Sequence, residues 1–351
     1  MSETRDLVRE AAERLFEKHC GAEIMRRTDG GEFPQALWCA LTEAGYTAAL
    51  VPEAAGGAGL DMSDALSLLV SAGRHAVPAP LAETMLAGWL LSAAGIPFPE
   101  GPLAVAPVRE GDAVTASRDG TGWRLQGKTG RVPWAARAAA IVVLARCEER
   151  NLVALAAPGD CRIVGGANLA GEARDDVDFS GVRCSVGAFA APDAAALRSL
   201  GAVMRSAQMA GALQSVLETS VQYARERVQF GRPIGRFQAV QQNLAVLAGQ
   251  AAAATAAAEA AIEAAAHNLH SPAVAAAKIR AGEAAGIGAA IAHQVHGAIG
   301  FTQEHRLHYS TRRLWSWRDE FGNEAYWARR LGGELAAAGA DRLWHGITAA
   351  G

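Results

Sequence analysis

The sequence has few cysteines and no arrangement of them that would form a metal site or a disulfide framework. Its 351 residues include five cysteines, none in C-x-x-C spacing: Cys20, Cys39, Cys147, Cys161 and Cys184. An odd and dispersed set of this kind is typical of reduced thiols. The cysteines therefore argue against a disulfide-rich secreted domain or a zinc ribbon and predict a cytoplasmic protein.

The sequence also has no long apolar run, and its first residues are not expected to be a leader peptide. The chain begins M-S-E-T-R-D-L-V-R-E, which is charged and amphipathic, unlike a secretory signal. No run of about twenty uncharged apolar residues suggests a membrane span. The alanine-rich stretch at 251–266 contains Glu259 and Glu263, four residues apart, and this spacing predicts a helix with one solvated face. We therefore expect no membrane association.

The sequence also has no large excess of charge of either sign. The chain has 33 basic and 36 acidic residues, a net charge of −3, and 50% apolar residues. This balance gives no reason to expect a nucleic acid partner and disfavours a helical DNA-binding protein. The length allows two or three domains, each with its own core.

The patterns along the chain predict an α+β protein with three domains. Residues 1–100 are expected to form an N-terminal α-helical domain, with helices at 3–20, 34–44, 61–72 and 81–94. Residues 101–193 form a middle β domain, an antiparallel barrel or sandwich, with strands at 113–117, 123–126, 139–145 and 152–156, and a strand at 176–184 leaving that layer. Residues 194–351 form a C-terminal four-helix bundle, with helices at 194–227, 237–268, 272–297 and 323–338.

Glycines interrupt several of these expected C-terminal helices. They are Gly211, Gly282, Gly286 and Gly288. Glycine inside a helix costs roughly 1 kcal/mol relative to alanine, so close helix crossings are the expected reason for its use.

The most informative stretch runs from Tyr223 to Gln242, where Gly231, Pro233 and Gly235 indicate a tight joint between two helices. Four arginines surround this joint: Arg225, Arg227, Arg232 and Arg236. Guanidinium groups are suited to binding a diphosphate, and Phe230 or Phe237 could stack on an aromatic ring. The alternative is a solvated basic turn in a helical hairpin.

Four segments, in order along the chain, resemble those of the acyl-CoA dehydrogenase family. L-T-E-A-G-Y-T-A-A-L-V-P-E-A-A-G-G-A-G-L-D (Leu41–Asp61) is similar to the family's N-terminal motif, and T-A-S-R-D-G-T-G-W-R-L-Q-G to the entry of its β domain. R-E-R-V-Q-F-G-R-P-I-G-R-F-Q is similar to its most recognisable C-terminal segment, and Q-V-H-G-A-I-G-F-T-Q-E (Gln294–Glu304) to its Q-x-x-G-G-x-G-[YF] segment. The resemblance covers nearly the whole chain.

The resemblance implies an FAD-dependent oxidoreductase that dehydrogenates an acyl-CoA thioester between its α and β carbons. It also implies a tetramer, with electron-transfer flavoprotein as the electron acceptor, in which the basic stretch reaches the FAD of a neighbouring subunit. By position, the implied cofactor-binding residues are Arg227, Gln229, Phe230, Ile234, Phe237, Gln294 and Gly297.

The sequence departs from the family at the catalytic base, a carboxylate that must remove a weakly acidic proton. The position at which most members carry a glutamate falls on Phe321, while Glu320 beside it would serve if the alignment shifts by one residue. Otherwise Asp319 and Glu320 form a charged helix terminus. The base position used by a minority of members falls on Gly201, followed by Ala202 instead of an arginine.

The sequence also departs from the family on the flavin side of the β domain. The family's T-E-P-x-A-G-S-D loop corresponds loosely to Ala106–Asp112. The usual tryptophan and threonine beside the flavin ring fall on Arg131 and Pro133, and Trp134 could take part only after a shift. Proline has no N–H to donate to the flavin. Arg131 could stabilise reduced, anionic flavin or be a surface residue.

Two main hypotheses follow. The chain is an FAD-dependent acyl-CoA dehydrogenase with Glu320 as its base, or it is a non-catalytic, paralogous subunit that completes the FAD site of its partner in a heterotetramer. Heteromeric members of the family include enzymes that act on steroid side-chain thioesters; others act in fatty acid catabolism. An acyl-CoA oxidase is a third possibility. His293, His296, His305 and His308 are not predicted to bind a metal, because their spacing spans a glycine turn.

Overall fold

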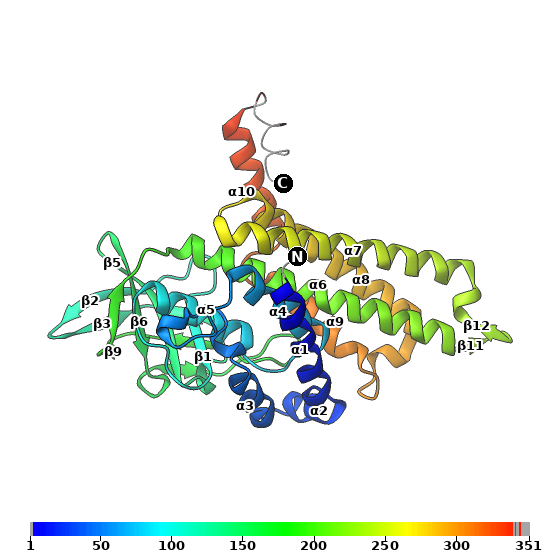
Figure 1. Cartoon of the computed structure of the whole chain (residues 1–351), viewed down its shortest axis with the longest axis horizontal. Helices are drawn as coiled ribbons and strands as arrows, with labels where there is room; N and C mark the ends of the chain where they lie inside the picture. Colours follow the sequence, from blue (N-terminus) through cyan, green and yellow to red (C-terminus); the bar gives the residue numbers. More distant parts are fainter. Residues whose placement is uncertain (1–2, 340, 342–343, 345–351) are drawn as a thin grey trace. The chain divides into compact units, whose positions relative to one another are not determined.

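The computed structural model describes residues 3–339, 341 and 344 (Figure 1). Helices come first: α1 (Glu3–His19), α2 (Ala22–Asp29), α3 (Gln35–Glu43), α4 (Met62–Arg74) and α5 (Leu81–Ala93), with short 3-10 turns η1 (Tyr46–Ala48) and η2 (Glu53–Ala55) between α3 and α4. Helices were predicted close to the positions of α1, α3, α4 and α5, but α2 was missed. Its eight residues, AEIMRRTD, bury only Met25, which leaves little apolar periodicity to detect.

The strands follow between residues 103 and 189. They are β1 (Leu103–Ala106), β2 (Thr115–Asp119), β3 (Gly122–Gln126), β4 (Lys128–Pro133), β5 (Ala140–Cys147), β6 (Arg150–Ala156), β7 (Arg162–Val164), β8 (Arg174–Asp178), β9 (Arg183–Cys184) and β10 (Gly187–Phe189), with turns η3 (Ala135–Arg137) and η4 (Pro158–Asp160). One sheet has the order β10-β6-β5-β2-β3-β9 with β1 also paired to β5, and a second has the order β4-β8-β7. Their shared core includes Trp123, Leu125, Ile141, Val143 and Phe179.

The sheets are open and sandwich-like, not closed into a barrel, and they are not purely antiparallel. β1 and β2 both run parallel to β5. β5 is buried along most of its length, as is usual for a central strand, and this gives the continuous apolar run in its sequence. The strand predicted at 176–184 is two strands, because the backbone turns at Ser180 and Gly181, where Gly181 has a φ of +83°.

Helices return at α6 (Ala194–Glu226), followed by the hairpin strands β11 (Val228–Gln229) and β12 (Arg232–Pro233) and the turn η5 (Ile234–Arg236). Then come α7 (Gln238–His267), α8 (Pro272–His296), the turn η6 (Gly297–Phe301), α9 (Leu307–Asp319) and α10 (Glu324–Ala338). The predicted joint between two long helices is confirmed, and it consists of a short hairpin and η5.

The helical core corrects the predicted bundle. Residues of α6, α7, α8 and α9 form one apolar cluster that includes Leu213, Leu247, Ala285 and Trp317. α9 was not predicted, because its sequence L-H-Y-S-T-R-R-L-W-S-W-R-D is rich in polar residues although nine of its side chains are buried. α10, which was predicted as the fourth helix, packs on α8.

Close helix packing explains two of the four glycines that were predicted to lie at helix crossings, Gly211 and Gly288. A Cβ at Gly211 of α6 would overlap the carbonyl oxygen of Val70 in α4. A Cβ at Gly288 of α8 would lie 2.8 Å from Leu213 Cδ2 and 3.1 Å from Leu247 Cδ1. Only hydrogen fits at these two positions without displacing a neighbour.

Contacts divide the chain into two compact units. The first, here called the helical unit, contains Met1–Met25, Leu66–Val77 and Ala202–Gly351. The second contains Arg26–Ala65 and Pro78–Gly201 and is called the β unit, because it holds all the strands from β1 to β10. This grouping places the N-terminal helix α1 with the C-terminal helices. The domain boundaries at residues 101 and 194 stay a prediction.

Candidate functional site

The predicted cofactor segment is an exposed two-residue hairpin loop. Phe230 and Gly231 connect β11 to β12 and both have positive φ, +51° and +79°, the backbone of a type I′ turn. Asparagine and glycine are the usual residues in such a turn, so a phenylalanine there is held in a costly conformation of the kind that occurs at functional sites. The Phe230 side chain is 91% exposed. The fold therefore presents this ring to the surroundings of the chain.

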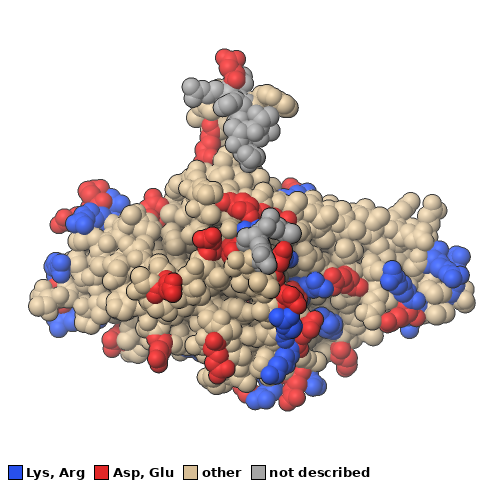
Figure 2. All heavy atoms as spheres, in the orientation of Figure 1, with Lys and Arg blue, Asp and Glu red and all other residues tan. Residues whose placement is uncertain are grey.

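The four arginines of this segment are not neutralised within the described residues. Arg225, Arg227 and Arg236 form no hydrogen bond or ion pair through their side chains, and Arg232 lies over the Phe237 ring at 4.4 Å. The nearby carboxylate of Glu226 accepts a hydrogen bond from Gln222 at 2.9 Å. Figure 2 shows basic side chains gathered at the end that carries β11 and β12. Unpaired guanidinium groups beside an exposed aromatic ring fit the diphosphate and ring system of FAD.

The structure brings the two predicted parts of the cofactor site onto neighbouring elements. Tyr223, one turn before Arg227 on α6, stacks on His296 of α8 with ring centroids 4.5 Å apart and planes inclined by 22°. Gln294 precedes His296 by two residues and is exposed, and Gly297 follows it with a φ of +64°. Both are therefore available at the same end of the helical unit as Arg227. The cofactor-binding roles of these residues remain proposals.

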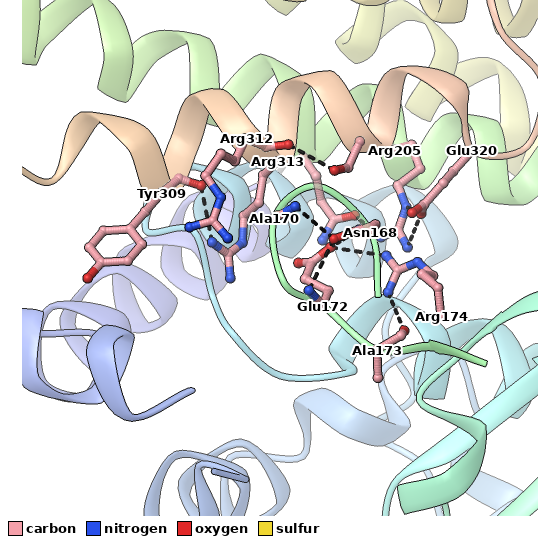
Figure 3. Close-up of polar contacts among 12 residues, drawn as sticks. Asn168, Ala170, Glu172, Ala173, Arg174, Arg205, Tyr309, Arg312, Arg313 and Glu320 are labelled. Atoms are coloured by element: carbon pink, nitrogen blue, oxygen red, sulfur yellow. Dashed lines mark hydrogen bonds and ion pairs between the residues drawn. The ribbon is translucent and has the colours of Figure 1, made fainter. Parts of the chain in front are cut away.

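The predicted base, Glu320, lies in an ion pair. It caps the C-terminal end of α9, and its Oε2 accepts hydrogen bonds from Nε and Nη2 of Arg205, each at 2.8 Å (Figure 3). The Arg205 side chain is 2% exposed and that of Glu320 is 13% exposed. Arg205 also donates to Gln208 Oε1. The guanidinium stabilises the ionised carboxylate and occupies one of its oxygens, so the arrangement suits a structural ion pair better than a free base. Glu320 as the base stays a prediction.

The neighbouring position, Phe321, holds a buried ring. Phe321 is 7% exposed, has a φ of +55°, and accepts a hydrogen bond at its carbonyl oxygen from Trp327 Nε1 at 3.0 Å. A phenyl ring cannot remove a proton. Gly201, the other aligned base position, is buried in α6 and likewise offers no carboxylate.

A buried lysine, which sequence reasoning missed, fixes the same turn. Lys278 of α8 is 0% exposed and its Nζ donates to the carbonyl oxygens of Arg318 and Gly322 at 2.6 and 2.7 Å. Burial lowers the pKa of Lys278 to about 8, although the carboxylates of Glu324, Glu320 and Asp319 oppose this shift. The signal in the sequence is weak, because Lys278 follows the apolar run 273–277 but is itself followed by Arg280 and Glu283. Its acceptors are 40 and 44 residues away.

In the β unit, the segment predicted to face the flavin is a β-bulge. The register between β4 and β8 shifts between Thr129 and Val132, and Arg131 has a φ of +58°. Asp112 of the loop Ala106–Asp112 accepts from the Gly130 N–H at 2.8 Å, and Asp176 accepts from the Arg131 N–H at 3.0 Å.

The bulge borders a cleft of about 420 Å³ with a mixed lining. Arg109, Lys128 and Arg162 lie alongside Asp112, Asp176 and Asp178. Pro133 and Trp134, the other residues predicted near the flavin ring, are buried, so neither supplies an exposed donor in the β unit itself.

Within residues 3–339 the structure shows no group of three or more histidine, cysteine or acidic side chains placed to hold a metal ion. The four histidines of the α8–α9 region instead make ring contacts. His293 stacks on Phe301 and on Trp315, with ring centroids 4.1 and 5.5 Å away. Burial lowers the pKa values of His293, His296 and His305, so these rings favour the neutral form.

Comparison with known proteins identifies the family. Residues 2–97 match the model of the acyl-CoA dehydrogenase N-terminal domain, and residues 197–324 match that of the acyl-CoA dehydrogenase C-terminal domain. Acyl-CoA dehydrogenase IpdE2 of Mycobacterium tuberculosis is 31% identical over 317 residues, which cover 89% of this chain and 91% of that protein.

Two solved structures of steroid or heteromeric enzymes are similar over nearly the whole chain. One is a variant of the steroid acyl-CoA dehydrogenase Tcur3481–Tcur3483, with a TM-score of 0.87 and 26% identity over 96% of this chain and 98% of that one. The other is the ChsE4–ChsE5 complex of M. tuberculosis, with a TM-score of 0.84 and 27% identity over the same shares. The chain belongs to the acyl-CoA dehydrogenase family, FAD-dependent oxidoreductases that dehydrogenate acyl-CoA thioesters.

Proposed function

We propose that this chain is a subunit of a heteromeric acyl-CoA dehydrogenase, which completes the FAD site of a related subunit and supplies no base of its own. The observation that carries the proposal is the turn after α9. Its carboxylate, Glu320, is held by Arg205 at 2.8 Å, and the next residue is the buried Phe321. A base must accept a proton from the substrate, and neither side chain is free to do so.

The exposed hairpin supports the second half of the proposal. Arg227, Gln229 and Phe230 are all exposed, so their side chains are able to reach a cofactor that another subunit holds. The chemistry that FAD would supply there is acceptance of a hydride from the β carbon of the acyl group. The roles of this chain are to hold the diphosphate and to exclude water from it.

The outer faces of α7 and α8 support assembly with another subunit. α7 is long and apolar enough to cross a membrane by length and composition, and one third of its most apolar window is buried. Its inner face belongs to the helical core through Leu247, Ala251 and Ala254. Its exposed residues include a set of apolar ones, namely Ala245, Val246, Gly249, Ala252, Ala253, Ala256 and Ala260, and α8 adds Ile287 and Ala290. An apolar helical face of this kind suits a subunit interface better than a lipid contact, because α7 also carries Glu259 and Glu263, which pair with α1.

The solved relatives agree with this arrangement. The ChsE4–ChsE5 structure is a complex of two named chains, and the Tcur3481–Tcur3483 enzyme is described as a steroid acyl-CoA dehydrogenase. On this basis we propose a heterotetramer acting in the cytoplasm on the coenzyme A thioester of a steroid side chain. Electron-transfer flavoprotein is the proposed acceptor.

The test is the visible spectrum of the purified chain, recorded alone and after co-expression with a related acyl-CoA dehydrogenase subunit, which is to be sought first among the neighbouring genes. The proposal predicts a colourless chain alone and a yellow complex that an acyl-CoA substrate bleaches. A yellow chain that is bleached by an acyl-CoA without a partner would instead establish the self-sufficient dehydrogenase.

A further inference from the structure

Three aromatic rings connect the two parts of the proposed cofactor surface, which are the segment 227–237 and the residues Gln294 and Gly297. Tyr223 of α6 stacks on His296 of α8 at 4.5 Å, and the ring of His305, in the segment before α9, lies edge-on to both, at 6.1 Å from Tyr223 and 4.7 Å from His296. His296 is 4% exposed. Arranged in this way, the three rings fill the space between the end of α6 and the end of α8.

Hydrogen bonds fix the orientation of the two histidine rings. His296 Nδ1 lies 2.8 Å from the carbonyl oxygen of Ala292, so this nitrogen carries the proton that it donates. His305 Nδ1 accepts from the Leu307 N–H at 3.2 Å, so its proton is on Nε2. Gly300 keeps the turn close, because a Cβ there would lie 3.0 Å from His296 Cβ. Each ring is therefore held in one tautomer and one position.

Backbone hydrogen bonds connect the ring stack to the residues of the proposed cofactor surface. The Tyr223 carbonyl oxygen accepts from the Arg227 N–H at 2.8 Å, and the Arg227 carbonyl oxygen accepts from the Ile234 N–H at 2.8 Å. On the other side, Gln294 and Gly297 flank His296 within one helical turn. The ring stack is therefore connected by the backbone to the base of the hairpin on one side and to the end of α8 on the other.

We propose that Tyr223, His296 and His305 are positioning residues for FAD, which set the separation between Arg227 and Gln294 that one FAD molecule must span. The inference rests on the proposed function, since it assigns both residues to the same cofactor. The rings need not touch FAD. Their effect is to preorganise two contacts that would otherwise move independently, and this lowers the ordering cost of binding.

The experiment uses the flavin-loaded complex with the related subunit. Tyr223→Leu and His296→Leu remove a ring, whereas Tyr223→Phe and His296→Phe keep one. Arg227→Ala removes the proposed diphosphate contact. Flavin per complex and FAD dissociation are measured by absorbance and fluorescence, and hydrogen exchange is measured at 228–237 and 297–306. Melting temperature and complex size are recorded for every variant.

We expect the two leucine variants to weaken FAD binding about tenfold, in line with the loss of one aromatic pair, and to raise exchange in both segments. The phenylalanine variants should restore both readouts. If the leucine variants bind FAD as tightly as wild type while Arg227→Ala loses it, the positioning role is refuted and the proposed function stands. If Arg227→Ala also keeps its FAD, the proposed function itself fails. Flavin loss that only accompanies a lower melting temperature or dissociated subunits, with no rescue by phenylalanine, would reduce the rings to general packing and overturn the inference.

Discussion

Removing Arg205 should destabilise the helical unit far more than removing an exposed arginine. In Arg205→Met, the Glu320 carboxylate would lose both donors to its Oε2 while remaining largely buried. Breaking a buried ion pair by removing one partner costs about 3–5 kcal/mol. Glu320 is 13% exposed, so water can reach it in part, and we expect a loss near the lower end, about 3 kcal/mol.

Such a loss is a large share of the about 5–15 kcal/mol by which folded domains are stable. The assay is urea unfolding of the isolated chain, with the midpoint and slope compared among variants. Adding Glu320→Gln to Arg205→Met removes the stranded charge. The double variant should therefore recover at least about 1 kcal/mol relative to the sum of the two single variants.

The matched control is Arg14→Met. Arg14 pairs with Glu10 on α1, and both side chains are 65% exposed, so no measurable loss is expected. If Arg205→Met unfolds at the same urea concentration as wild type, Glu320 is not held as described. Glu320 would then be free enough to serve as a base.

Three further predictions concern stability. Lys278 has a folded pKa of about 8, below its ordinary 10.5, so the unfolded chain binds more protons than the folded chain between these pH values. Wild type should therefore gain stability as pH rises from about 8 to 10.5. If a Lys278→Met variant shows the same gain, burial of this lysine is not its cause. Gly211→Ala should destabilise the chain by about 1–3 kcal/mol, because its methyl group meets α4. The control Gly249→Ala has open space around it on α7 and should stabilise the chain by about 0.5–1 kcal/mol. Equal melting temperatures for the two variants would refute the close crossing of α6 and α4. Burial lowers the pKa of His296, so the unfolded chain takes up this proton at a higher pH than the folded chain does. Wild type should therefore lose stability as pH falls below about 6.5, and His296→Phe should show a shallower loss in pH-dependent melting curves. Parallel curves for the two proteins would count against a buried neutral ring.

The elements with strong local signals could be predicted from the sequence. α6, α7 and α8 are long, apolar on their inner faces and bounded by proline and glycine, and their expected limits agree with the structure within about two residues. The joint between α6 and α7 could be predicted from the spacing of Gly231, Pro233 and Gly235, although the hairpin within it could not. Because charge and spacing are local properties, the cluster of four arginines could be recognised before the fold was known.

The elements that depend on distant partners could not be predicted. β1 is only a short apolar run in the sequence, and it pairs in parallel with β5, which lies more than thirty residues further along the chain. α9 buries Arg313 and His308, so its polar sequence concealed a core helix. The pairing of Arg205 with Glu320 joins residues 115 apart in the sequence, and no pattern near either one indicates it. The candidate site was therefore predicted as a set of residues, while the contacts that decide their roles required the fold.

The central claim is that this chain assists a partner's flavin without supplying the base. The most direct test is turnover per bound flavin in the complex that carries Glu320→Gln in this chain alone. We expect turnover within about twofold of wild type, because the proton is removed by the partner's carboxylate. General base catalysis contributes about 10²–10⁴-fold, so a fall of that size in turnover per flavin would assign the base to Glu320 and contradict the central claim.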